Sequence, residues 1–173
     1  MSSKRNPAAS NNWQTPSHLC EMIDFFVLEM GFDRVTLDPA TTQENPMGAE
    51  FIRTPECDPD GLQTEWFHLL HEDPRFVYVN PPYQAAWYAK IHLEGVRMRG
   101  AHENCHMIAL LPAKPGTQYF ANLMGTASAN CFVTGRLTFR GATEPAPFES
   151  SLMYWGNKPH HFRAHFEELG WVI

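Results

Sequence analysis

The sequence predicts an α/β fold in which helices cover a largely parallel sheet. Residues 76–79 and 107–111 form two uninterrupted apolar runs, as expected for strands that are buried on both faces. A helical pattern separates the two runs, and further strand and helix patterns alternate after them. Such alternation is typical of layered α/β domains, so we expect a single domain over residues 13–173.

The first predicted element is a helix that follows a polar segment. Residues 1–12 are rich in Ser and Asn and are expected to form a mobile tail. We expect Thr15 to cap the helix, Pro16 to occupy its first position and Gly31 to end it. Apolar residues at helical spacing form its core face: Leu19, Met22, Ile23, Phe26, Val27 and Met30.

Later elements are predicted from the same kinds of pattern. Residues 35–38 are β-prone, whereas residues 39–61 are so dense in Pro, Thr, Asp and Glu that they predict a long loop. A helix should lie between the two apolar runs and end at Gly100, with a core face of Ala86, Ala89, Leu93 and Val96. The remaining predictions are helix 119–124, strand 131–134, strand 151–155, helix 161–169 and a short run at 171–173.

Composition and charge exclude several classes of protein. The 173 residues are 43% hydrophobic, which is enough to build a core without disulfides. The four cysteines form no CxxC pair, no apolar leader or membrane span is visible, and the histidines lack metal-ligand spacing. We therefore expect a reducing cytoplasm, no membrane and no metal.

Charge is unevenly distributed along the chain. Residues 1–75 carry 5 basic and 13 acidic side chains, whereas residues 76–173 carry 8 basic and 6 acidic ones. Polyanion contacts are therefore expected in the second half.

The most informative string is Asn80-Pro81-Pro82-Tyr83, directly after the strand at 76–79. Ligands of α/β sheets bind at the carboxyl ends of the strands. The two prolines fix the backbone so that a carbonyl projects outward, Asn80 adds a second acceptor, and Tyr83 offers a flat ring. These groups suit a planar amino group that is held by two acceptors. Asn-Pro-Pro alone is equally consistent with a second interpretation, in which the prolines merely end the strand and Tyr83 packs in the core.

Five further strings accompany this tetrapeptide in order along the chain. They are Trp13-Gln-Thr15-Pro16, Leu37-Asp38-Pro39-Ala40, Asp60-Gly61-Leu62, Leu110-Leu-Pro-Ala113 and Gly135-Arg136-Leu-Thr-Phe139. Together they resemble the small phage-type (Dam-like) DNA N-6-adenine methyltransferase family, from about Trp13 to Trp155. The resemblance implies a Rossmann-like S-adenosylmethionine-dependent methyltransferase fold, with a mostly parallel sheet and flanking helices. It also implies a phage or prophage enzyme that acts in the cytoplasm of a bacterial host.

The resemblance further implies the reaction and the partners. S-adenosylmethionine would be the cofactor and DNA the partner, with the target adenine flipped into the pocket. Asn80, Pro81, Pro82 and Tyr83 would be catalytic: Asn80 Oδ1 and the Pro81 carbonyl accept the hydrogens of the amine, and Tyr83 stacks on the ring. The implied cofactor-binding residues are Trp13, Thr15, Pro16, Asp38, Pro39, Ala40, Asp60, Leu62 and Asn80.

Two features of the cofactor region limit what the resemblance predicts. Asp38 is followed by Pro-Ala-Thr-Thr and not by the glycine-rich turn of larger methyltransferases, which the phage-type family generally lacks as well. No ribose-binding acid is evident, although Glu44 and Glu50 are candidates. Asp38 is the expected acceptor for the amino-acid or ribose end of the cofactor, and Asp60 is the expected acceptor for its adenine. Taken alone, each of these aspartates is equally consistent with a solvated charge on a loop.

Basic and aromatic residues in the second half are candidates for DNA contacts. Side chains suited to phosphate contact are Lys114, Thr117, Gln118, Arg136 and Arg140. Phe139 and Phe148 are candidates for stacking on a displaced base, and they fit core positions equally well.

Two other functions remain open at this stage. One is methylation of a protein glutamine, because Asn-Pro-Pro-Tyr suits any planar amide. The other is a catalytically weak DNA-binding protein on the same scaffold. The oligomeric state is not predicted.

Overall fold

The computed structural model describes residues 13–67, 73–101 and 103–173, and it has the mixed α/β composition that the sequence predicts. The expected mobile tail at residues 1–12 lies outside these ranges. In chain order, the elements are α1 (Ser17–Glu29), β1 (Leu37–Asp38), β2 (Phe51–Ile52), β3 (Arg75–Val79), α2 (Ala85–Met98), β4 (Cys105–Pro112), α3 (Gln118–Met124), β5 (Ala129–Val133), β6 (Ser150–Trp155), α4 (Pro159–Phe166) and β7 (Gly170–Val172).

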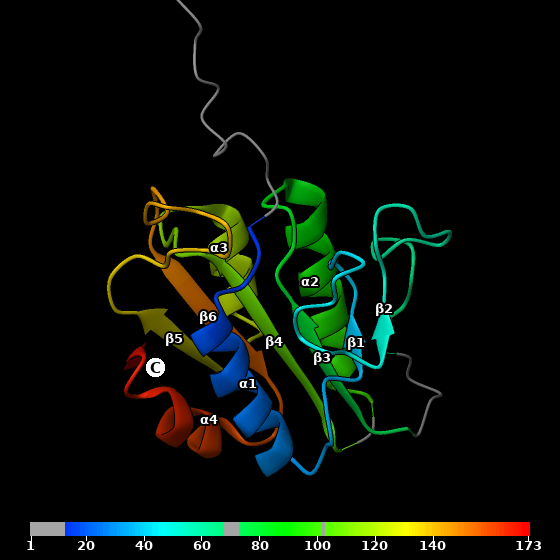
Figure 1. Cartoon of the computed structure of the whole chain (residues 1–173). Helices are drawn as coiled ribbons and strands as arrows, with labels where there is room; N and C mark the ends of the chain where they lie inside the picture. Colours follow the sequence, from blue (N-terminus) through cyan, green and yellow to red (C-terminus); the bar gives the residue numbers. More distant parts are fainter. Residues whose placement is uncertain (1–12, 68–72, 102) are drawn as a thin grey trace, which may run out of the picture.

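The described strands form one seven-stranded sheet with the order β2-β1-β3-β4-β6-β5-β7 (Figure 1). The pairings among β2, β1, β3 and β4 are parallel, whereas β6 is antiparallel to β4 and β5, and β7 is antiparallel to β5. The prediction of a mostly parallel sheet is therefore wrong. The reason is that β6 enters the sheet in the reverse direction between β4 and β5, which themselves run the same way.

Helices cover both faces of the sheet, with α1 and α4 on one side and α2 and α3 on the other (Figure 1). Alternate residues of β3 face the two layers. Phe76 and Tyr78 belong to the core beneath α1 and α4, and Val77 and Val79 to the core beneath α2 and α3. This confirms the prediction of a strand that is buried on both faces. Within the described ranges, no helix is long and apolar enough to cross a membrane.

The predicted core face of α2 is wrong. Its residues are exposed in the structure: Ala86, Ala89, Leu93 and Val96. The face that is buried carries Trp87, Tyr88, Lys90, Ile91, Glu94 and Gly95. Lys90 and Glu94 lie in the core because their charged groups form an ion pair at 2.7 Å. Gly95 allows a close approach to the sheet, since a Cβ there would lie 2.7 Å from Nε1 of Trp155.

The start of α1 also differs from the prediction. The helix begins at Ser17 with Pro16 as its N-cap residue, and no side chain caps it. The hydroxyl of Thr15, the predicted cap, lies 2.7 Å from the hydroxyl of Tyr78 on β3. Thr15 is thus bound to the sheet and not to the first turn of the helix. Gly31, the predicted end, follows the helix closely and has a left-handed φ of 86°.

Candidate active site

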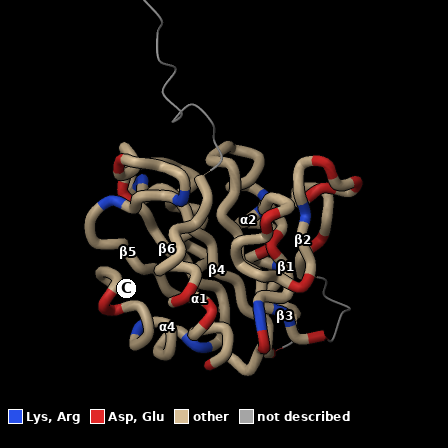
Figure 2. The backbone as a smooth tube through the Cα atoms, in the orientation of Figure 1, with Lys and Arg blue, Asp and Glu red and all other residues tan. Residues whose placement is uncertain are grey.

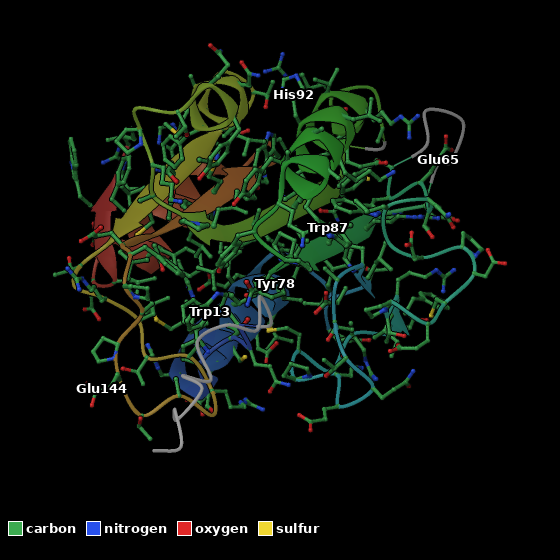
Figure 3. All side chains as sticks on the ribbon, turned by 90° about the horizontal axis from the view of Figure 1, so that it is seen from above. Trp13, Glu65, Tyr78, Trp87, His92 and Glu144 are labelled. Atoms are coloured by element: carbon green, nitrogen blue, oxygen red, sulfur yellow. The ribbon has the colours of Figure 1, made fainter. Side chains whose placement is uncertain are left out.

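The candidate site lies where the order of the strands reverses. From β1 the chain runs outward to β2 and then returns to β3, on the other side of β1. Such a switch leaves a crevice at the carboxyl ends of the central strands, where open α/β sheets bind ligands. Asp38 is the last residue of β1, and Asn80 directly follows β3. Both line one narrow recess together with Trp13, Thr15 and Tyr78. Figure 3 looks down on this edge and shows Trp13 beside Tyr78.

The side-chain amide of Asn80 is hydrogen-bonded at both ends. Its Nδ2 donates to the carbonyl oxygen of Trp13 and, at 3.1 Å, to Oγ1 of Thr15. Its Oδ1 accepts the hydroxyl of Tyr83 at 3.1 Å. Burial raises the pKa of Tyr83, so the phenol keeps its proton and remains a donor. The tetrapeptide and the Trp-Gln-Thr-Pro segment, far apart in sequence, therefore form one hydrogen-bonded unit.

Aromatic rings close the recess on one side. The ring of Trp13 packs against those of Phe139 and Phe148, with centroids 5.2 and 5.5 Å apart. Phe148 also meets the ring of Tyr83 edge to face at 5.5 Å. Phe139 is only 2% exposed and belongs to the main core, so it supports Trp13 and offers no open face. Phe148 is half-buried and touches Tyr83, which makes it the closer of the two to the tetrapeptide.

Asp38 is a buried carboxyl group at the floor of the recess. It is 3% exposed, and its Oδ1 accepts the backbone N–H of Ala40 at 3.2 Å. Burial raises its pKa to about 7, although the hydrogen bonds from Ala40 and Thr41 oppose this shift. Burial raises the pKa of the nearby Cys20 thiol to about 11, so this thiol is neutral where Asp38 titrates. Asp38 is thus suited to gain its charge when a cation binds beside it.

A second, larger cavity of about 420 Å³ adjoins the recess. Ala40 and Thr42 line both spaces. The larger cavity is lined further by Pro39, Arg53, Thr54, Pro55, Asp60, Gly61, Leu62, Pro82, Gln84 and Trp87. Arg53 and Trp87 were not predicted as site residues. Arg53 directly follows β2, whose two residues are too few to produce a recognisable strand pattern.

The Asp-Gly-Leu segment is fixed in this cavity by its own backbone. Oδ1 of Asp60 accepts the backbone N–H groups of Leu62 and Gln63, each at 3.0 Å. The indole N–H of Trp66 donates to the carbonyl of Gly61 at 3.0 Å. The buried carboxylate of Glu94 on α2 accepts the backbone N–H of Phe67 at 2.9 Å. The buried charge of α2 therefore anchors the segment that follows Asp-Gly-Leu.

A family model described as DNA N-6-adenine-methyltransferase (Dam) matches residues 2–152. The chain belongs to this family. No curated protein sequence matches the chain significantly. The matched region contains all six strings of the sequence analysis, and it confirms the family that they indicate. Membership supports methylation of adenine N6 in DNA as the activity.

In this Dam-family protein, the basic DNA-contact candidates lie on loops at the site edge of the sheet. Lys114 follows β4, which runs parallel to β3, so both strands end at this edge. Arg140 forms a backbone bridge with Gln14, which lines the recess. Arg136 forms an exposed ion pair with Glu149 at 3.6 Å. Figure 2 shows basic and acidic segments together on the loops above β5 and β6, and mostly Asp and Glu segments around β1 and β2.

Two further DNA-contact candidates lie at the start of α3. The side-chain hydroxyl of Thr117 donates to the Lys114 carbonyl at 2.7 Å, and Gln118 is exposed. Among the residues that the structure describes, no group of three or more His, Cys, Asp or Glu side chains is placed to hold a metal ion.

Proposed function

We propose that this protein transfers the methyl group of S-adenosylmethionine to N6 of an adenine flipped out of DNA, using a Rossmann-like arrangement of β1 to β4. The observation that carries the proposal is that Asp38 and Asn80 line one recess at the switch point of the sheet. A group that can bind the cationic end of the donor therefore adjoins a group that can hold the target amine. Family membership supports the reaction, and the motifs support a phage-type enzyme in a bacterial cytoplasm.

The residues present suit this cofactor. Asp38 can accept hydrogen bonds from the ammonium group of the cofactor. The larger cavity offers apolar walls at Leu62, Pro82 and Trp87 for the cofactor's adenine. A volume of about 420 Å³ lies in the range of small-molecule sites. Asp60 lines the same space and is the expected acceptor for the adenine. When bound, S-adenosylmethionine supplies an electrophilic methyl group on a sulfonium sulfur.

The target amine would be held by two acceptors. Asn80 Oδ1 retains a lone pair beyond the one that accepts the Tyr83 hydroxyl, and the Pro81 carbonyl is the second acceptor. Hydrogen bonds from the amine to both would draw its nitrogen toward tetrahedral geometry and free its lone pair for in-line attack. Catalysis would then rest on positioning and electrostatics, with proton loss after transfer. Tyr83 would stack its ring on the base.

The test of the proposal is transfer of a labelled methyl group from S-adenosylmethionine to DNA. We expect the label in DNA at adenine N6, and none in a glutamine-containing peptide, which tests glutamine methylation. Calorimetric titration of the cofactor accompanies the assay. DNA binding and cofactor binding without methyl transfer would favour the catalytically weak alternative and contradict the proposal.

Cofactor affinity should rise with pH toward neutrality. Only ionised Asp38 attracts an ammonium group, and its pKa of about 7 means that binding at lower pH must first remove a proton. The cofactor's own amino group is protonated over this range. We expect the Kd to increase roughly tenfold for each pH unit below about 7. Calorimetry between about pH 5.5 and 7 checks this.

The matched variant for this prediction is Asp38→Asn. It should bind the cofactor more weakly at neutral pH and lose most of the pH dependence, because the replaced group cannot ionise. Cys20 and Tyr78, two titratable groups near Asp38, both have pKa values raised by burial and stay neutral throughout. An identical pH profile in parent and variant would place the cofactor's cationic end elsewhere.

DNA binding should depend on the basic loops at the site edge. We expect the plot of log affinity against log salt to become less steep when Lys114, Arg136 and Arg140 are replaced by Gln. Its negative slope should shrink in magnitude by roughly 0.9 for each phosphate group that is no longer neutralised. Arg136 should contribute least, because Glu149 offsets its charge. Arg163→Gln on α4, at the other end of the molecule, is the control (Figure 1). Equal slopes in the triple variant and the parent would mean that DNA binds another face.

A further inference from the structure

The Asn80 side chain can perform its proposed role in only one of two orientations. An amide oxygen and an amide nitrogen are nearly equal in size, so rotation of the side chain by half a turn exchanges them at little steric cost. With Oδ1 toward the target amine, Asn80 is an acceptor. With Nδ2 there, it would present hydrogens to an amine that also carries hydrogens, and the proposed activation would be lost.

Two oxygen atoms outside the tetrapeptide accept hydrogen bonds from Nδ2 of Asn80 in the useful orientation. The carbonyl oxygen of Trp13 is purely an acceptor, and it contacts Nδ2 of Asn80. Oγ1 of Thr15 accepts the same amide at 3.1 Å. A rotated Asn80 would place its own oxygen against the Trp13 carbonyl, which is repulsive. The bridge between Gln14 and Arg140, with its 2.9 Å hydrogen bond from Arg140 N–H to the Gln14 carbonyl, secures this segment.

The Thr15 hydroxyl is itself fixed by a buried partner. Thr15 is 2% exposed and Tyr78 is 1% exposed, and their hydroxyl oxygens lie 2.7 Å apart. Either hydroxyl can supply the proton of this contact. When Thr15 donates to Tyr78, its oxygen has only lone pairs left for Asn80, so it favours the same amide orientation as the Trp13 carbonyl. Burial raises the pKa of Tyr78, so its proton stays in place. Figure 3 shows Tyr78 next to Trp13.

We propose that Thr15 and Tyr78 are positioning residues for methyl transfer, which hold the Asn80 amide with Oδ1 toward the target amine. This inference rests on the proposed function. It gives the Thr of the Trp-Gln-Thr-Pro string a role that helix capping does not explain, because no side chain caps α1. The chain of hydrogen bonds runs from Tyr78 on β3 to Thr15, which precedes α1, and from Thr15 to Asn80, which directly follows β3.

The kinetic test compares Thr15→Val with Thr15→Ser. Val keeps the shape and removes the oxygen, whereas Ser keeps the acceptor. We expect kcat to be roughly 10- to 100-fold lower in Thr15→Val than in the parent, a loss typical of a misplaced reacting group. In Thr15→Ser, kcat should stay close to the parent's value. The cofactor Kd should change far less than kcat in either variant. Tyr78→Phe should give a smaller fall, because Thr15 can still accept from Asn80.

Matched controls separate positioning from general destabilisation. Thr36→Val removes another threonine hydroxyl, one that accepts the backbone N–H of Phe76 at 3.1 Å away from the recess. Tyr154→Phe removes a buried hydroxyl that contacts His106 at 2.7 Å. Both should retain the parent's kcat. Parent-like kcat in Thr15→Val, or an equal loss in Thr15→Val and Thr15→Ser, would overturn the positioning role.

A second measurement does not depend on activity. Hydrogen exchange of the Asn80 side-chain amide, followed by NMR on the full-length protein, should be slow in the parent and in Thr15→Ser. It should be faster in Thr15→Val, because Nδ2 then lacks one of its two acceptors. Equal exchange in all three proteins would overturn the inference. A parent protein that transfers no methyl group to DNA would contradict the proposed function instead, and the exchange data would still decide whether Thr15 fixes the amide.

Discussion

Replacement of Asn80 by Ala is expected to reduce kcat for DNA methylation by at least about 100-fold, the usual cost of losing an oriented polar group at a reacting centre. The variant keeps the Pro81 carbonyl but loses the acceptor that is directed by Trp13 and Thr15. Transfer of labelled methyl groups to DNA measures the loss. Turnover at the parent's rate would exclude Asn80 from the reaction.

The same variant should keep its fold and its cofactor. Asn80 lies after β3 and is only partly buried, so its removal leaves both core clusters intact. Calorimetry should show nearly unchanged cofactor affinity, because Asp38 and the larger cavity remain. Asn122→Ala, at an exposed position on α3, is the matched control and should behave as the parent in both methyl transfer and calorimetry.

The strands that carry the site were predictable because burial on both faces leaves a clear mark in sequence. Residues 76–79 and 107–111 are apolar without interruption, and the structure places them in β3 and β4. The rule that ligands bind at strand ends then brings Asp38 and Asn80 to one edge. Apolar runs carry no information on direction, however, so the reversed β6 between β4 and β5 was not predictable from them.

Polar residues with unusual partners account for the other differences. The buried face of α2 contains Lys90 and Glu94, which are acceptable in a core only because they neutralise each other. Thr15 stands before a proline at a helix start, where a capping role is the general expectation. Its actual partners, Tyr78 and Asn80, are more than 60 residues away in sequence, and no local pattern reveals such contacts.

Gly61→Ala is expected to damage the cofactor cavity and the fold together. A Cβ at this position would lie 1.7 Å from the carbonyl oxygen of Pro39 and 2.9 Å from the ring of Trp87. The oxygen belongs to the backbone of the turn after β1, so neither segment can yield without moving the other. Overpacking of this kind typically costs about 1–3 kcal/mol of stability.

Because Pro39 and Leu62 line the same cavity on either side of this contact, a shift of either backbone changes the shape of the cavity. We expect the cofactor Kd of Gly61→Ala to rise at least about tenfold, equivalent to about 1.4 kcal/mol, with a lower Tm. Gly116→Ala is the control, since a Cβ there meets nothing within 4 Å, and its stability should change by less than about 0.5 kcal/mol. A Gly61→Ala protein with the parent's Tm and cofactor affinity would show that the two turns move independently. The Asp-Gly-Leu segment would then not depend on its contact with the turn after β1.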